Sequence, residues 1–268
     1  MGHFSKDSYS NIIKLVQREG FQFLSFQEEH HQKQRTVYLR HDVDYSLSMA
    51  VELARINASL GVRGTFFVLL RSQIYNLLSH WALAQVREIL ASGQRVALHC
   101  ALPPTAPKSQ EILDDIVLTD FAVVKEQIPE MEPVYSWHNP TREVLDISES
   151  IELPGFVNVY HQRFVKQARY LSDSNLRYTV PEWERLLIEA EQSVLHLLFH
   201  PLNWVAGGND MCDVLAKTWR HIIKEREYEI VRNTTYQRLM PGGMPESVLE
   251  EFSRSWINAT LQEKSQAS

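Results

Sequence analysis

The sequence lacks most of the features that mark secreted or membrane-spanning proteins. It has only two cysteines in 268 residues, Cys100 and Cys212, which are too few and too far apart for a disulfide framework or a zinc ribbon. The first residues show no basic segment followed by an apolar one, the pattern of a secretion signal. No apolar run approaches the roughly eighteen residues that span a bilayer. We therefore expect a cytoplasmic protein without a membrane span.

The sequence also lacks an excess of positive charge. It carries 33 acidic and 27 basic side chains, for a net charge of -6. A nucleic-acid-binding protein needs a concentrated basic face to neutralise phosphates. The charge balance therefore argues against a nucleic-acid partner, and it does not bear on a neutral or sugar-like ligand.

Internal repeats and low-complexity linkers are missing as well, and 44% of the residues are hydrophobic. A chain of this length can bury one large core, and α/β barrels of this size often form one domain. We therefore predict a single domain over residues 1–268. A plausible amphipathic helix and a polar tail occupy its last stretch, Pro245 to Ser268.

The hydrophobic pattern predicts strands that alternate with helices. Predicted strands are Thr36–Arg40, Gly64–Leu70, Arg95–Leu98, Pro133–Trp137, Val157–Tyr160, Ala168–Leu171 and Ser193–Phe199. Predicted helices are Ser8–Gly20, Ser46–Leu60, Trp81–Ser92, Ser109–Glu126, Pro181–Ala190 and Asp210–Arg226. Repeated strand–helix units imply parallel strands with right-handed crossovers. With about seven strands, a closed or nearly closed (β/α) barrel is favoured over an open sheet.

Polar side chains of a reactive kind follow several of these strands. They are Asp42, Asp44, His99, His138, Asp173 and His200. Loops at the carboxyl ends of parallel strands converge on one mouth. Carboxylates and imidazoles gathered there could hold a divalent ion with an open position for water, while a second carboxylate and a histidine move protons. The set favours metal-assisted hydrolysis over core packing.

Three ordered segments resemble the motifs of a known family. They are Leu39–Ser46 with its Asp-x-Asp pair, Gly61–Phe67, and Leu90–His99. In this order they resemble the NodB-homology polysaccharide deacetylases, which are carbohydrate esterase family 4-like. Tyr75–Leu78, Ser172–Ser174 and Leu198–Trp204 fit a branch found among surface-polysaccharide and O-antigen biosynthesis proteins. The resemblance covers about residues 36–235.

The resemblance implies a fold, a reaction and roles for individual residues. The fold is a distorted seven-stranded (β/α) barrel. Asp42 would be the general base, Asp44 and His99 metal ligands, and His200 the general acid. The reaction would remove an acyl group, most often acetyl, from an N-acylated sugar or glycan precursor, with Zn²⁺ or a similar divalent ion.

One position departs from the family pattern. The common second motif has another histidine four residues after the first, and this sequence has Pro103 there. The third ligand must come from elsewhere, or the metal site is weak or absent. His138 is the candidate, although a structural or substrate-contacting role is equally open.

The other candidate site residues could have structural roles instead of functional ones. Arg40 could pair with Asp42 and lower its pKa, and we group it with Trp137, Asp173 and Trp204 as substrate-binding candidates. The two tryptophans could stack on a sugar ring or simply pack in the core. Asp173 could orient a catalytic group or form a turn. The aspartates of the Asp-x-Asp pair could cap the following helix, and the histidines could be satisfied core residues.

Two functions of other classes compete with the hydrolase. One is a non-catalytic barrel that lost its metal and binds a glycan or a protein, which Pro103 favours. The other is a metal-independent amidohydrolase that acts on a small C–N substrate. Fold alone does not decide among them.

Overall fold

A computed structural model describes residues 3–31, 34–103, 109–150, 153–252, 254–255 and 258. Its centre is a parallel sheet with strand order β6-β5-β4-β3-β2-β8-β7. The strands on this path are β2 (Thr36–Val43), β3 (Thr65–Leu69), β4 (Arg95–Ala101), β5 (Val134–His138), β6 (Val157–Asn158), β7 (Arg169–Ser172) and β8 (Val194–Phe199). The short β1 (Gln22–Leu24) pairs with the start of β2. The seven-stranded parallel architecture expected from the sequence is confirmed.

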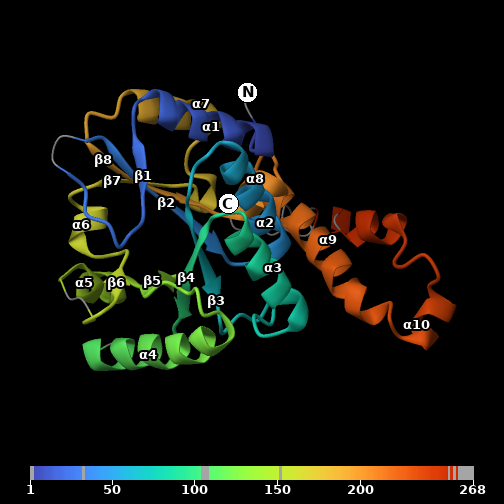
Figure 1. Ribbon diagram of the computed structural model, residues 1–268. Helices are drawn as coiled ribbons and strands as arrows, with labels where there is room; N and C mark the ends of the chain where they lie inside the picture. The colour runs from blue at the N-terminus through green and yellow to red at the C-terminus, as the bar shows by residue number, and fades with distance from the viewer. Residues whose placement is uncertain are drawn as a thin grey trace.

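Helices surround this curled sheet (Figure 1). The longer ones are α1 (Lys6–Arg18), α2 (Leu47–Ser59), α3 (His80–Ala91), α4 (Gln110–Gln127), α5 (Arg142–Ser150), α7 (Val180–Ile188) and α9 (Met211–Ile230). The short ones are α6 (Gln162–Val165), α8 (Pro201–Val205) and α10 (Thr234–Leu239), with a 3₁₀ turn at Ser174–Leu176. Within the described residues no pairing joins β6 to β7, so the barrel stays open between its two end strands.

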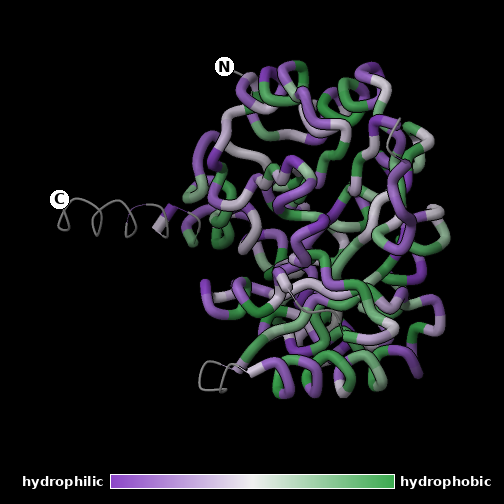
Figure 2. The backbone as a smooth tube through the Cα atoms, turned by 90° about the vertical axis from the view of Figure 1, so that its left-hand side faces the viewer, coloured by the Kyte–Doolittle hydropathy of each residue, from purple (hydrophilic) through white to green (hydrophobic). Residues whose placement is uncertain are grey.

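The strands are buried on both faces because helices cover the sheet outside and side chains fill its inside. All residues of β2, β3 and β8 are buried, as is typical of parallel strands. Hydrophobic and hydrophilic residues alternate within the turns of the covering helices (Figure 2), as in a helix that presents one face to a core.

Strand β2 extends further than the sequence predicts. Polar residues suggested an end at Arg40, but the ladder continues to Val43, with His41 paired to Phe66 and Asp42 to Phe67 of β3. A strand can continue through charged residues when their side chains have buried partners. As a result Asp42 lies on the strand and Asp44 just beyond it.

The elements absent from the prediction are short. Strand β1 and helices α6 and α8 have three to five residues, too few to show a hydrophobic period. The nine-residue α5 was also not predicted.

The chain after the barrel forms a helical arm in which α9 and α10 extend away from the sheet (Figure 1). Residues 246–252 are helical, as expected for the segment from Pro245. The polar tail predicted at the very end lies in 259–268, outside the described residues. Across the part of the chain that is described, no helix is long and apolar enough to cross a membrane.

Candidate active site

The register of the sheet brings the predicted residues to one level. His41 of β2 pairs with Phe199 of β8, so His200 follows at the level of Asp42. Val43 pairs with Val68, and the next residue of β3, Leu69, pairs with His99 of β4. Asp44 and His99 therefore stand at the same height with β3 between them.

Asp42 is held by an arginine from its own strand. The Nε and Nη2 atoms of Arg40 donate to the two carboxylate oxygens of Asp42, each at 2.7 Å, and Tyr160 accepts from the same Nη2 at 3.1 Å. Both charged side chains are buried. Burial by itself would raise the pKa of Asp42, but Arg40, together with His99 and His200, outweighs burial and keeps this pKa below its usual value. Asp42 is therefore a carboxylate at neutral pH, as a base must be.

Asp44 faces two histidines. Its Oδ1 atom lies 3.2 Å from Nε2 of His99 and 3.3 Å from Nδ1 of His138. The other ring nitrogen of His99 is 2.6 Å from Oγ of Ser136, which fixes the ring from behind. Burial opposes ionisation of Asp44, yet the two histidines hold its pKa well below the usual value, and Asp44 in turn raises the pKa of His138.

His200 forms a dyad with Asp173 of the loop after β7. Its Nδ1 atom is 2.5 Å from Oδ1 of Asp173, whose carboxylate also accepts from the His200 backbone amide. Trp204 donates its Nε1 hydrogen to the same carboxylate at 2.7 Å. Burial alone would lower the pKa of His200, but the Asp173 charge raises it to about 9. His200 is therefore a cation at neutral pH.

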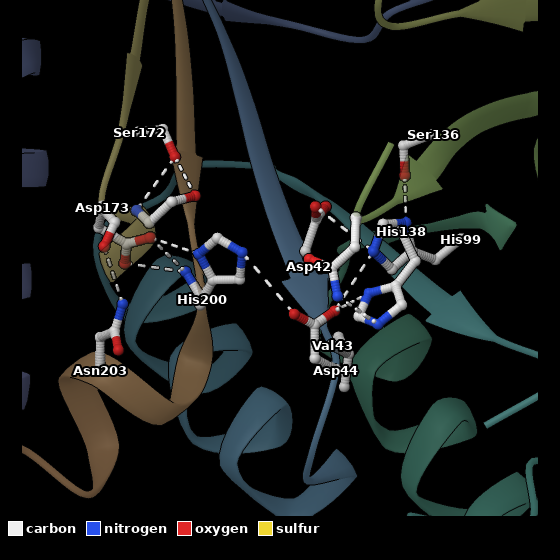
Figure 3. A network of polar contacts seen from close by, with 12 residues as sticks. Asp42, Val43, Asp44, His99, Ser136, His138, Ser172, Asp173, His200 and Asn203 are labelled. Atoms are coloured by element: carbon white, nitrogen blue, oxygen red, sulfur yellow. Dashed lines mark hydrogen bonds and ion pairs between the residues drawn. The ribbon is translucent and has the colours of Figure 1, made fainter. Parts of the chain in front are cut away.

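Asp44 lies between these two groups, with His200 on one side and His99 and His138 on the other (Figure 3). Nε2 of His200 is 3.8 Å from Oδ2 of Asp44. The His200–Asp173 dyad and the Asp44, His99 and His138 cluster thus lie close together at the carboxyl ends of their strands.

The donor set fits a divalent transition metal. Ligand atoms of Asp44, His99 and His138 all lie within 4.8 Å of one another. Oδ1 of Asp44 is buried and has no partner with hydrogen-bond geometry, although two imidazole nitrogens are near it. One carboxylate and two imidazoles are a zinc-type set that leaves a position for water or substrate. His138, and not a residue at position 103, completes this possible cluster, while Pro103 itself is exposed after β4.

A cleft of about 590 Å³ opens over this cluster. It is lined by Asp44, Tyr45, Leu69, Arg71, Ser72, Gln73, Ile74, Ala101, Leu102, His138, Asn139, Ser174, Asn175, His200, Leu202, Asn203, Met211, Leu215 and Trp219. The lining combines aromatic and aliphatic side chains with amides and hydroxyls, so it can contact both the apolar and the polar faces of a ligand.

The substrate-binding predictions for four residues need correction. Trp137 and Trp204 are 1% and 0% exposed, and neither lines the cleft. Trp137 instead donates to Ser148 at 2.9 Å, and Trp204 supports Asp173. Arg40 is also fully buried and serves Asp42. Each of these three has a buried hydrogen-bond partner, although Nη1 of Arg40 has none. Asp173 is 0% exposed and acts on His200, so it too lies behind the cleft.

Sequence reasoning missed the aromatic residues that do line the cleft. Tyr45 and Trp219 form an edge-to-face pair with ring centroids 6.3 Å apart. Tyr45 directly follows Asp44, and that adjacency was an available signal. Trp219 lies in the middle of α9, and only the path of the arm brings it to the site.

Comparisons with known proteins found similarity only to solved structures. Neither a protein-family model nor a curated protein matches the chain. A CE4 family pseudoenzyme from Bacillus anthracis, solved also as a mutant with restored enzymatic activity, matches with a TM-score of 0.45 at 14% identity over 73% of this chain. The match covers 63% of the pseudoenzyme and 65% of the mutant, under two thirds of their length.

Two further structures are similar at the same level of identity. A Streptococcus pyogenes deacetylase in complex with acetate has a TM-score of 0.42 at 13% identity, over 73% of this chain and 81% of its own. A family 4 carbohydrate esterase from Bacillus anthracis has a TM-score of 0.36 at 15% identity, over 81% and 86%. By their names, these similar structures are a CE4 family pseudoenzyme, a deacetylase and a family 4 carbohydrate esterase.

Proposed function

We propose that the protein is a metal-dependent hydrolase that removes an acyl group, N-acetyl in the first instance, from a sugar or polysaccharide precursor in the cytoplasm. The observation that carries the proposal is the position of Asp44. Its carboxylate lies between two imidazoles on one side and the protonated His200 on the other. This arrangement combines a metal-ligand cluster and a proton donor within one cleft.

The proposed roles follow from the contacts around Asp44, which lines the cleft with His138 and His200, while Asp42 and His99 lie buried beside it. Asp44, His99 and His138 would hold the ion, which would supply Lewis-acid chemistry by activating water and polarising the acyl carbonyl. Asp42, whose Oδ2 is 3.6 Å from Nε2 of His99, takes the proton from the attacking water. His200 then protonates the amide nitrogen as the C–N bond breaks. One water is consumed, and a carboxylic acid and a free amine are released.

The lining of the cleft supports a carbohydrate as the substrate class. Sugars present C–H faces that stack on aromatic rings and hydroxyls that bond to amides. Tyr45 and Trp219 offer the rings, and Asn139, Asn203 and Gln73 offer amides.

The experiment measures zinc content and acetate release together on the purified full chain. We expect about one ion per chain and acetate release from N-acetylated sugars in the wild type, with both lost in Asp44→Ala. Asp115→Ala removes an exposed carboxylate of α4 and should change neither. Acetate release that survives in a metal-free wild type would overturn the metal-dependent proposal.

The His200–Asp173 dyad supports a second candidate function, a metal-independent amidohydrolase. His200 and Asp173 are complete without a metal, as a metal-independent amidohydrolase would require. That enzyme would keep its activity in a chelator and lose it in His200→Ala. The third alternative, a non-catalytic glycan- or protein-binding barrel, would bind sugars without releasing acetate under any metal condition.

A further inference from the structure

We propose that Arg71 binds an anionic group of the substrate, so that the preferred substrate is an N-acylated sugar bearing a phosphate or carboxylate. This inference rests on the proposed function and deepens it by naming the charge class of the substrate. It starts from a charged pair that the hydrolytic mechanism does not use.

Arg71 stands at the mouth of the cleft. Strand β3 ends at Leu69, beside His99, and Arg71 follows two residues later. It lines the same cleft as Asp44, His138 and His200, and its side chain is 54% exposed. The Arg71 guanidinium can therefore contact a ligand that enters the cleft past the end of β3.

One edge of this guanidinium is fixed from beneath. Oδ1 of Asp120, from α4, accepts from Nε of Arg71 at 2.8 Å and lies 2.7 Å from Nη2. Asp120 is 1% exposed and does not line the cleft. Both contacts use the Nε–Nη2 edge, which leaves donors of Nη1 for a ligand. A guanidinium held in this way loses little conformational entropy when it binds an oxyanion, and its planar geometry suits that ligand.

The rest of the cleft does not repel an anion. Among its described lining residues, Asp44 is the single acidic side chain. Asp44 is 12% exposed and is enclosed by His99, His138 and His200. The protein as a whole is acidic, so an anionic substrate needs a local cationic contact of this kind.

The test compares the binding of three ligands that differ in charge, by calorimetry on zinc-loaded protein in which His200→Ala blocks their hydrolysis. The phosphate probe is N-acetylglucosamine 1-phosphate, and the carboxylate probe is N-acetylglucosaminuronic acid. The neutral probe is the methyl glycoside of N-acetylglucosamine. We expect Arg71→Met to weaken phosphate binding about tenfold or more, as for the loss of a charge-assisted contact. The same substitution should weaken binding of the neutral glycoside less than threefold. Arg71→Lys keeps the charge but loses the planar guanidinium. Its affinity for the phosphate ligand should lie between those of the parent protein and Arg71→Met.

Controls separate recognition from folding and from failure of the hydrolase itself. Arg55→Met removes an equally exposed arginine that pairs with Glu88 and does not line the cleft, and it should leave all three affinities unchanged. Asp120→Asn should weaken phosphate binding while thermal unfolding shows it folded. Equal weakening of charged and neutral ligands in Arg71→Met would overturn the inference. Absence of acetate release from any ligand would count against the proposed hydrolase alone, since binding is measured without turnover.

Discussion

Individual residues at the carboxyl ends of β2 and β8 carry charge inside the protein, and each has a partner that fixes its ionisation. Arg40 holds Asp42 as a carboxylate, and Asp173 holds His200 as a cation. A buried ion is stable only when its partner supplies both charge and hydrogen bonds. Removing one partner should therefore change the chemistry of the other before it changes the fold.

Asp173→Asn tests this for the proposed proton donor. The amide cannot stabilise the imidazolium, so we expect the kcat for acetate release to fall about a hundredfold, the low end of what general acid catalysis contributes. Zinc content should stay at the wild-type level because Asp173 is not in the ligand cluster. Trp204→Phe keeps the carboxylate and serves as the milder comparison. Wild-type turnover in Asp173→Asn would show that the dyad does not donate the proton.

His196 should make the fold sensitive to acid. It is fully buried on β8, where Nδ1 contacts the Phe164 carbonyl at 3.1 Å, and burial lowers its pKa to about 3. In the unfolded chain a histidine titrates near 6.5, so protons favour unfolding below that pH. Its contribution to the free energy of unfolding is complete above about pH 6.5 and falls by up to about 1.4 kcal/mol per pH unit toward pH 3.

The measurement is urea unfolding of wild type and His196→Phe between pH 7.5 and 4.5. The variant should lose less stability over this range, while substitution of the exposed His30 by phenylalanine should leave the slope unchanged. Parallel pH profiles for wild type and His196→Phe would contradict the assignment.

At the scale of elements, the arm helix α9 is tied to the start of α2. Glu225 accepts from Ser46 Oγ at 2.8 Å and also from Ser48 Oγ, and His221 lies 2.7 Å from Ser48 Oγ. Ser46 is the N-cap of α2, two residues after Asp44. Because Trp219 lies on α9 beside Tyr45, this cluster sets the position of the aromatic wall of the cleft.

Glu225→Gln should therefore loosen the arm. The Glu225 side chain is 9% exposed, and the loss of charged hydrogen bonds at a buried site costs about 1–3 kcal/mol. We expect a lower midpoint in thermal unfolding and a higher KM for the sugar with little change in zinc content. As a control, Glu246→Gln breaks exposed contacts with Arg220 and Lys224, which are worth at most about 1 kcal/mol. Equal effects of the two variants would argue against a special role for the cluster.

For the whole molecule, the ligand cluster should couple metal binding to stability. Asp44 directly follows β2, His99 lies on β4 and His138 is the last residue of β5, so an ion would join strands that are distant in sequence. An ion that binds only the folded chain stabilises it by about 4 kcal/mol when its concentration is a thousand times Kd.

We therefore expect a chelator to lower the Tm measured by calorimetry, and added zinc to restore it. His138→Ala should abolish the response, whereas His31→Ala, at an exposed position, should retain it. A zinc-dependent Tm in His138→Ala would show that this histidine is not the third ligand.

The main architecture could be predicted from the sequence because its signals are local. Strands such as Thr65–Leu69 are short apolar runs, and helices such as Leu47–Ser59 have apolar residues at helical spacing. Their alternation leaves few topologies beyond a parallel sheet. Asp42, Asp44, His99 and His200 could be selected because each lies within two residues of the carboxyl end of a strand.

Other features depended on tertiary contacts between distant segments. The burial of Trp137 and Trp204 followed from partners eleven and thirty-one residues away, and the approach of Trp219 to Tyr45 followed from the path of α9. The third member of the ligand cluster was decided by register, because Ala101 pairs with His138 and places it beside His99. The sequence by itself determined which residues could do chemistry and the order of strands and helices. Only the tertiary structure decided which side chains meet in the cleft, because those contacts cross the sheet and no local pattern encodes them.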